Sequence, residues 1–157
     1  MAISARRAVT PGKILVSLVG SSAAVGAFAA DWNETHIYNP NWPPHAKFHN
    51  AQTMVFAVDL AAISLYQLWV RKPYTRSSLR WATLFAGLFW GAQAPAILFP
   101  GTAFTDPEQA GSQPKVLGVT INQLVGQVVL VYPLLGLGYY LESRRLRRTE
   151  ARSDRST

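Results

Sequence analysis

Apolar residues gather in four long blocks along the chain, separated by polar segments. The blocks cover 14–30, 51–70, 81–99 and 116–141, which are 17, 20, 19 and 26 residues long. A helix needs roughly 17–25 residues to cross the hydrocarbon core of a bilayer. The blocks are too long for strands and do not alternate, and backbone groups in lipid must bond within their own segment. The pattern therefore predicts an all-α protein, a bundle of four transmembrane helices over these four blocks.

Basic residues mark one side of these predicted helices. The chain carries 15 Lys and Arg against 8 Asp and Glu, a formal net charge of +7. Only Lys47 and Lys115 fall in the linkers 31–50 and 100–115. The other thirteen basic residues fall before the first block, between the second and third, or after the fourth: Arg6, Arg7, Lys13, Arg71, Lys72, Arg76, Arg80, Arg144, Arg145, Arg147, Arg148, Arg152 and Arg155. Because basic linkers stay in the cytoplasm, both termini are predicted to be cytoplasmic.

Composition narrows the class of protein further. The 157 residues allow one domain, and 15% charged residues is well below the roughly 25% of soluble domains. We therefore predict a multi-pass membrane domain over 1–142 and a basic cytoplasmic tail over 143–157, which we expect to be disordered. The absence of cysteine excludes a disulfide scaffold and a thiol nucleophile. The excess positive charge indicates topology and contact with the lipid bilayer rather than nucleic acid, and the oligomeric state is left open.

The first block has a second interpretation, as a secretory signal peptide. Arg6, Arg7 and Lys13 precede an apolar stretch that ends in small residues at 27–30. However, the stretch exceeds the usual apolar region of about 7–15 residues. It also contains small residues four apart, such as Gly20 and Ala24, which allow helices to pack closely in lipid. We expect an uncleaved helix.

The linker after the first block holds all three histidines of the chain, His36, His45 and His49. Its content of Trp, Tyr and Pro, without Gly or Ser, predicts an ordered segment rather than a flexible tether. A helix that begins near Pro44 would continue into the second block and place His45 and His49 on one face. The same face carries Gln52, Phe56, Asp59 and Tyr66.

Three roles remain open for the histidines. His45 and His49, with His36 as a third ligand, can bind a single metal ion, and no other cofactor is indicated. Alternatively, the histidines act as acid or base near neutral pH. In the third interpretation they are interfacial residues beside an aromatic belt.

Asp59 is the only ionisable residue within a predicted span. Such a residue is costly in lipid and is expected to face the bundle interior. The candidate catalytic residues are therefore His36, His45, His49 and Asp59. Further polar or aromatic residues near the same side of the membrane are candidates for ligand binding: Asp31, Trp32, Asn33, Asn39, Trp42, Gln52, Gln93, Asn122, Gln123 and Gln127.

The run DWNETHIYNPNWPPHAKFH over 31–49 resembles the signature DWN-x-TH-x-x-NP-x-WPPHAKFH of a family of small four-helix membrane proteins without an established function. The bundle is also similar in architecture to the emopamil-binding and sigma-2 receptor group (EXPERA), whose members carry carboxylates in a membrane cavity for sterols or amines. That group's loop pattern differs, so the similarity assigns no catalytic residue here.

Three functions follow from this arrangement. The first is an integral membrane protein whose outward or lumenal site binds or transforms a lipophilic small molecule such as a sterol, terpenoid or polyketide. The second is a non-enzymatic subunit or assembly factor that docks a partner through the 31–50 loop. The third is a transporter subunit that uses Asp59. The sequence does not decide whether the protein is an enzyme.

Overall fold

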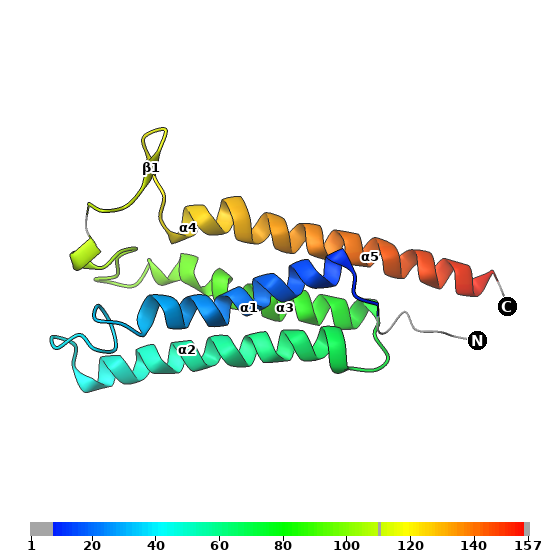
Figure 1. Ribbon diagram of the computed structural model, residues 1–157, viewed down its shortest axis with the longest axis horizontal. Coiled ribbons are helices and arrows are strands. Elements are labelled where there is room, and N and C mark those ends of the chain that lie inside the picture. The colour runs from blue at the N-terminus through cyan, green and yellow to red at the C-terminus, as the bar shows by residue number, and fades with distance from the viewer. Residues whose placement is uncertain (1–7, 110, 156–157) are drawn as a thin grey trace.

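The computed structural model describes residues 8–109 and 111–155, which form an elongated bundle of helices (Figure 1). Arg6, Arg7 and the last two residues of the predicted tail lie outside the described residues. In chain order the elements are α1 (Pro11–Asp31), α2 (Pro44–Leu65), the π-helix η1 (Tyr66–Val70), α3 (Arg76–Ala96), the 3₁₀ turn η2 (Pro107–Gln109), β1 (Lys115–Val116), β2 (Val119–Thr120), α4 (Gln123–Gly126), the π-helix η3 (Gln127–Val131) and α5 (Tyr132–Asp154).

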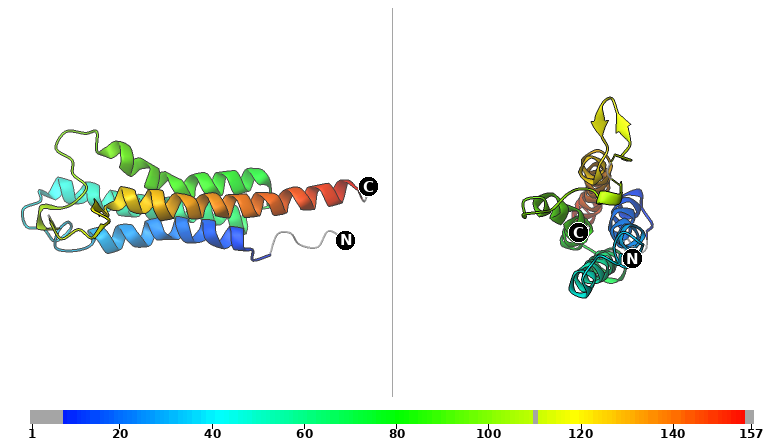
Figure 2. Two further views of the ribbon diagram at one scale, coloured as in Figure 1. Left: turned by 90° about the horizontal axis from the view of Figure 1, so that it is seen from above. Right: turned by 90° about the vertical axis from the view of Figure 1, so that its left-hand side faces the viewer.

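The bundle has two distinct ends. The segments 32–43 and 97–122 lie together at one end, which we name the loop end (Figure 1). The start of α1, the end of α5 and the 71–75 connection lie at the other, which we name the terminal end. The helix continues from α2 into η1, and from α4 through η3 into α5, so the chain forms four long rods. The α5 helix extends past the others at the terminal end (Figure 2).

Side-chain caps explain where several helices begin. Thr10 accepts a hydrogen bond from the Lys13 amide at 3.3 Å, and Pro11 occupies the first turn of α1, where no amide donor is needed. Thr75 and Ser78 form a reciprocal capping box at the start of α3. At the start of α2, Pro44 occupies the first turn as predicted.

The α1 helix contacts each of the other long helices, α2, α3 and α5. Its buried face is built from small and β-branched residues, including Val16, Gly20 and Ala23. A Cβ on Gly20 would lie 3.4 Å from both Ala86 Cβ and Ser64 Oγ, so the three helices α1, α2 and α3 meet closely there. Such close approach of backbones suits helix packing in lipid. Cleavage after the first block would remove α1 and these contacts.

The fourth predicted span and the tail need correction. The span does not begin at residue 116, because the chain forms a β1–β2 hairpin there, with Leu117 and Gly118 at positive φ. The helix begins only after Asn122, whose side chain accepts bonds from the Leu124 and Val125 amides. The tail was expected to be disordered, yet α5 continues to Asp154. Arg145 at one helical turn from Glu142 and the Arg76–Glu150 ion pair at 3.2 Å support this extension.

Among the described residues, three helices are long and apolar enough to cross a membrane, namely Pro11–Asp31, Pro44–Val70 and Gln123–Asp154. The α3 helix is not among them; it carries Arg76 and Arg80 in its first turns and Gln93 and Pro95 in its last. The chain is therefore mostly helical and suited to a membrane, while the count of four spans and the side on which the termini lie stay predictions.

Candidate functional site

A cavity of about 850 Å³ opens between α1, α2, α3 and the start of α4, toward the loop end. Phe56, Phe89 and Trp90 supply its aromatic walls, together with small residues of α1 such as Gly26 and Ala27. The C-terminal part of α3 diverges from the bundle at this end (Figure 2). The expectation that Trp90 lines the interior is confirmed.

Five of the predicted polar site residues line this cavity, and they come from four separate helices. They are Asp31 at the end of α1, His49 and Gln52 on α2, Gln93 on α3 and Gln123 on α4. The remaining lining residues are apolar or small, apart from Thr53. A mostly apolar hollow with a few convergent polar groups is the usual composition of a small-molecule site.

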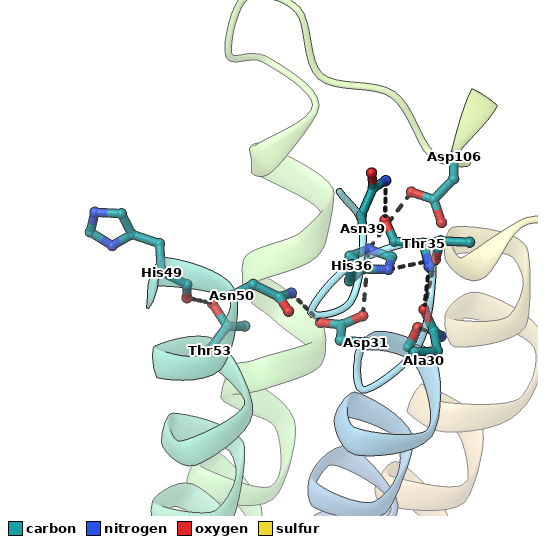
Figure 3. A network of polar contacts seen from close by, with 10 residues as sticks. Ala30, Asp31, Thr35, His36, Asn39, His49, Asn50, Thr53 and Asp106 are labelled. Atoms are coloured by element: carbon teal, nitrogen blue, oxygen red, sulfur yellow. Dashed lines mark hydrogen bonds and ion pairs between the residues drawn. The ribbon is translucent and has the colours of Figure 1, made fainter. Parts of the chain in front are cut away.

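Asp31 belongs to a polar network that joins the two loops of the loop end (Figure 3). Its Oδ1 lies 3.8 Å from His36 Nε2, and its Oδ2 accepts a hydrogen bond from Asn50 Nδ2 at 2.8 Å. On its other side, His36 Nε2 lies 3.7 Å from Asp106 Oδ1, in the segment before η2. His36 therefore stands between two carboxylates, and it connects the cavity-lining Asp31 with the distant 97–122 segment.

Neighbouring side chains hold His36 in this position. Thr35 Oγ1 lies 2.8 Å from His36 Nδ1, and the Trp42 ring packs edge-on against the imidazole at 5.0 Å between centroids. Asn39 is buried and bonds to the Thr35 carbonyl at 3.0 Å, and its amide also reaches Glu108 Oε1 at 3.5 Å. Asn33 accepts from the Thr35 amide and closes the first turn of the loop. The prediction of an ordered 31–50 segment is confirmed.

His45 and His49 share a face of α2 as predicted, with their Nε2 atoms 3.1 Å apart. His49 Nδ1 lies 3.1 Å from Gln52 Oε1, which only accepts hydrogen bonds. The pair is exposed at the edge of the cavity.

The structure does not bring the three histidines together. His36 pairs with Asp31 and Asp106, whereas the His49 ring points away from that network (Figure 3). Across 8–109 and 111–155, no group of three or more His, Asp or Glu side chains is placed to hold a metal ion. The three-histidine metal site is therefore not supported, since His36 is drawn to Asp31 and Asp106 and not to His45 and His49.

The expectation that Asp59 faces the bundle interior is wrong. Asp59 is exposed and does not line the cavity. The buried face of α2 contains Ala57 and Ala61, and Asp59 lies two residues from each. Two residues correspond to about 200° around a helix, so Asp59 projects on the opposite side. The carboxyl group that the structure places at the cavity is Asp31.

The other predicted ligand-binding residues have structural positions around the cavity rather than in its wall. Gln127 is 1% exposed and donates from Nε2 to Gln93 Oε1, so it lies behind the lining residue Gln93. Asn122 caps α4. Trp32 is half-exposed and donates from Nε1 to the Tyr38 hydroxyl, outside the cavity.

Sequence reasoning missed a second polar cluster, at the terminal end. Glu142, 1% exposed, accepts from Thr10 Oγ1 at 2.6 Å and from Arg145 Nη2 at 2.6 Å. Lys13 is fully buried, with its Nζ 4.1 Å from the Tyr74 ring centroid and 4.8 Å from that of Trp69. Burial raises the pKa of Tyr74, and the nearby Glu142 carboxylate raises it further.

This cluster had a sequence signal. Lys13 immediately precedes the first apolar block and Glu142 immediately follows the fourth, on the same predicted side and with opposite charges. Lys13 was interpreted only as a topology residue. Two antiparallel helices that pack together bring such flanking residues near each other, so the opposite charges indicated that Lys13 and Glu142 share one end of the bundle. Lys13 Nζ itself lies over the Tyr74 and Trp69 rings and has no hydrogen-bond partner among the described residues.

The chain matches one known protein family. The family of unknown function (DUF6640) matches residues 15–153. The chain belongs to this family. No curated protein and no solved structure matches it significantly. The match spans all four long rods, the 32–43 loop and most of α5, so the cavity and the network around His36 both lie within the region that defines the family.

Proposed function

We propose that this protein binds a lipophilic small molecule in the cavity at the loop end. The supporting observation is the cavity itself, because its volume of about 850 Å³ falls within the range of roughly 300–1,000 Å³ typical of ligand sites. Phe56, Phe89 and Trp90 suit the apolar body of such a ligand. Asp31, Gln52 and Gln123 at the rim suit a polar head group.

The same geometry identifies which groups would serve chemistry if the ligand is transformed. Asp31 both lines the cavity and pairs with His36, which in turn faces Asp106. An imidazole that lies within 4 Å of two carboxylates can serve as a general acid or base beside them. In this proposal the acid–base residues are Asp31 and His36, with His49 at the opposite edge, and Asp59 has no part.

The direct test is to purify the full chain in a mild detergent and to identify co-purifying lipophiles by mass spectrometry. The Gly26→Leu variant fills the cavity, because a Cβ on Gly26 would lie 3.9 Å from Trp90 and so fits without a clash. The matched control is Gly136→Leu on α5, where a Cβ meets nothing within 4 Å and no cavity residue is nearby.

We expect the wild type and Gly136→Leu to retain the same lipophile, and Gly26→Leu to lose most of it. Retention by all three proteins would show that the lipophile sits on the outer surface of the helices and would refute the cavity as its site. If a lipophile is found, turnover of that compound by Asp31→Asn and His36→Gln variants tests the acid–base roles separately from binding.

The exposure of Trp32, at 54%, favours a second candidate, a docking surface for a partner protein on the 31–50 loop. Tyr38 and Phe48 are also exposed there, at 51% and 61%. Trp42, by contrast, is packed against His36 and is not available. A Trp32→Ala variant that loses a co-purifying protein but keeps the lipophile would support docking as an additional role.

A further inference from the structure

A basic groove runs along α5 at the terminal end, far from the cavity. It has a volume of about 400 Å³ and is lined by Leu141, Arg144, Arg145, Arg148, Thr149 and Arg152. Residues four apart on a helix lie above one another, so Arg144, Arg148 and Arg152 form a single row. Arg145 and Thr149 form the adjacent row. The helical continuation of α5, which the sequence did not predict, is what creates this alignment.

The charge of the groove is not balanced by its own residues, since none of the six lining residues is acidic. Glu142 neutralises Arg145, with 2.6 Å between Oε1 and Nη2. Glu150 pairs with Arg76 of α3 and does not line the groove. Arg144 is held by Tyr140, whose hydroxyl accepts from Nη1 at 3.1 Å. The row of three arginines therefore keeps its excess positive charge.

Aromatic residues locate the groove relative to a bilayer. Trp69 in η1, Trp81 in α3 and Tyr140 in α5 are 37%, 47% and 52% exposed, toward the terminal end of the bundle. Half-exposed Trp and Tyr are enriched at membrane–water interfaces. Arg144 follows Tyr140 by one helical turn, or about 6 Å, which places the groove just beyond the aromatic belt, at the depth of lipid phosphates.

We infer that this groove binds the phosphate of an anionic phospholipid head group. Guanidinium groups bind phosphate oxygens in pairs, and the row of Arg144, Arg148 and Arg152 offers such donors to one head group. The Arg144 side chain is already fixed on the Tyr140 ring, with 5.5 Å between Cζ and the centroid. The inference does not depend on the cavity ligand and requires only that the bundle crosses a bilayer with its terminal end at the surface.

The test compares two adjacent arginines of the full chain. Arg148→Gln removes a charge from the groove, while Arg147→Gln removes the same charge from an exposed residue that does not line it. Each protein is purified in neutral detergent and titrated with phosphatidylglycerol, with phosphatidylcholine, or with inorganic phosphate. Native mass spectrometry reports the fraction that retains lipid, and thermal unfolding reports stabilisation.

We expect the wild type to retain phosphatidylglycerol in preference to phosphatidylcholine. Arg148→Gln should weaken retention about tenfold, because it removes a charge-assisted contact to the phosphate that contributes about 1.5 kcal/mol. Arg147→Gln should stay within about twofold of the wild type, as expected of a residue outside the groove. Equal losses in the two variants would show diffuse attraction to the whole helix and would overturn the site. Equal stabilisation by inorganic phosphate alone would assign the groove to a soluble phosphate instead of a lipid.

Discussion

Thr10 donates a hydrogen bond of 2.6 Å to Glu142, and the two residues stand 132 positions apart in the sequence. Thr10 also caps α1 through the Lys13 amide. The contact therefore connects the N-cap residue of α1 with α5. A buried carboxylate is tolerated only when its oxygens are bonded, and here Thr10 takes Oε2 while Arg145 takes Oε1. Both oxygens of the buried Glu142 carboxylate are therefore hydrogen-bonded at the terminal end.

We predict that Glu142→Ala strongly destabilises the protein. The change leaves the buried Lys13 ammonium without its nearby carboxylate, and removing one member of a buried charge cluster costs about 3–5 kcal/mol. The control is Glu150→Ala on the same helix, where the ion pair with Arg76 is nearly half-exposed and contributes at most about 1 kcal/mol. Unfolding of both variants in the same detergent measures the difference. Equal effects would contradict a special role for the buried cluster.

A second prediction concerns the crossing of α1 and α5. A Cβ on Gly12 would lie 2.7 Å from both Glu142 Cβ and Glu142 N, and 2.8 Å from the Gly138 carbonyl. Since two of these atoms belong to backbone, the helices must move apart to admit a methyl group. We expect Gly12→Ala to lower the free energy of unfolding by about 1–3 kcal/mol, the usual effect of overpacking.

The control for this crossing is Gly136→Ala, which meets no atom within 4 Å. It should be neutral or stabilising by up to about 1 kcal/mol, because alanine favours the helix more than glycine does. Thermal unfolding in detergent compares the two variants. If Gly12→Ala were as stable as Gly136→Ala, the close approach of α1 and α5 would be incorrect.

A third prediction concerns the side-chain amides of Gln93, which lines the cavity, and Gln127, which lies behind it. Gln127 is buried and donates to Gln93, so Gln93→Leu leaves the Gln127 side chain without its acceptor. An unsatisfied buried amide costs about 1–3 kcal/mol, which sets the expected loss of stability. The double variant Gln93→Leu, Gln127→Leu removes both partners and should recover most of that loss. A double-mutant cycle measured by thermal unfolding gives the coupling, and strictly additive effects would exclude a bond between the amides.

The sequence was sufficient for most of the fold because the dominant force on this chain is the segregation of apolar residues. Long apolar runs predicted the helices, and Pro44 correctly predicted the start of α2. The wrong predictions concern the two ends of the last helix, whose positions depend on local backbone structure or on contacts between residues far apart in the sequence. The hairpin at 115–120 and the Asn122 cap delay the last helix. The Arg76–Glu150 pair and the docking of Glu142 on Thr10 extend it.

The candidate site was predictable in part for the same reason. Helical spacing correctly placed Gln52 and Phe56 with His49 along one wall. It could not show which face of α2 packs inward, so Asp59 was assigned to the interior. Nor could it show the partner of His36, because that contact depends on how the 97–122 segment folds back over the loop end and brings Asp106 within 3.7 Å.

The last prediction tests that contact between loops. His36→Ala removes the group that faces both Asp31 and Asp106, and it leaves two carboxylates near each other without an intervening imidazole. We expect amides such as those of Tyr38 and Asn39, which bond within the loop, to exchange with deuterium severalfold faster, since each of the two partly exposed ion pairs of His36, at 3.8 and 3.7 Å, contributes up to about 1 kcal/mol. His45→Ala is the matched control, because His45 is exposed on α2 and contacts neither carboxylate. Comparable acceleration in both variants would mean that the loop is held by other contacts, whereas acceleration in His36→Ala alone would establish the histidine as the connection between the 32–43 loop and the 97–122 segment.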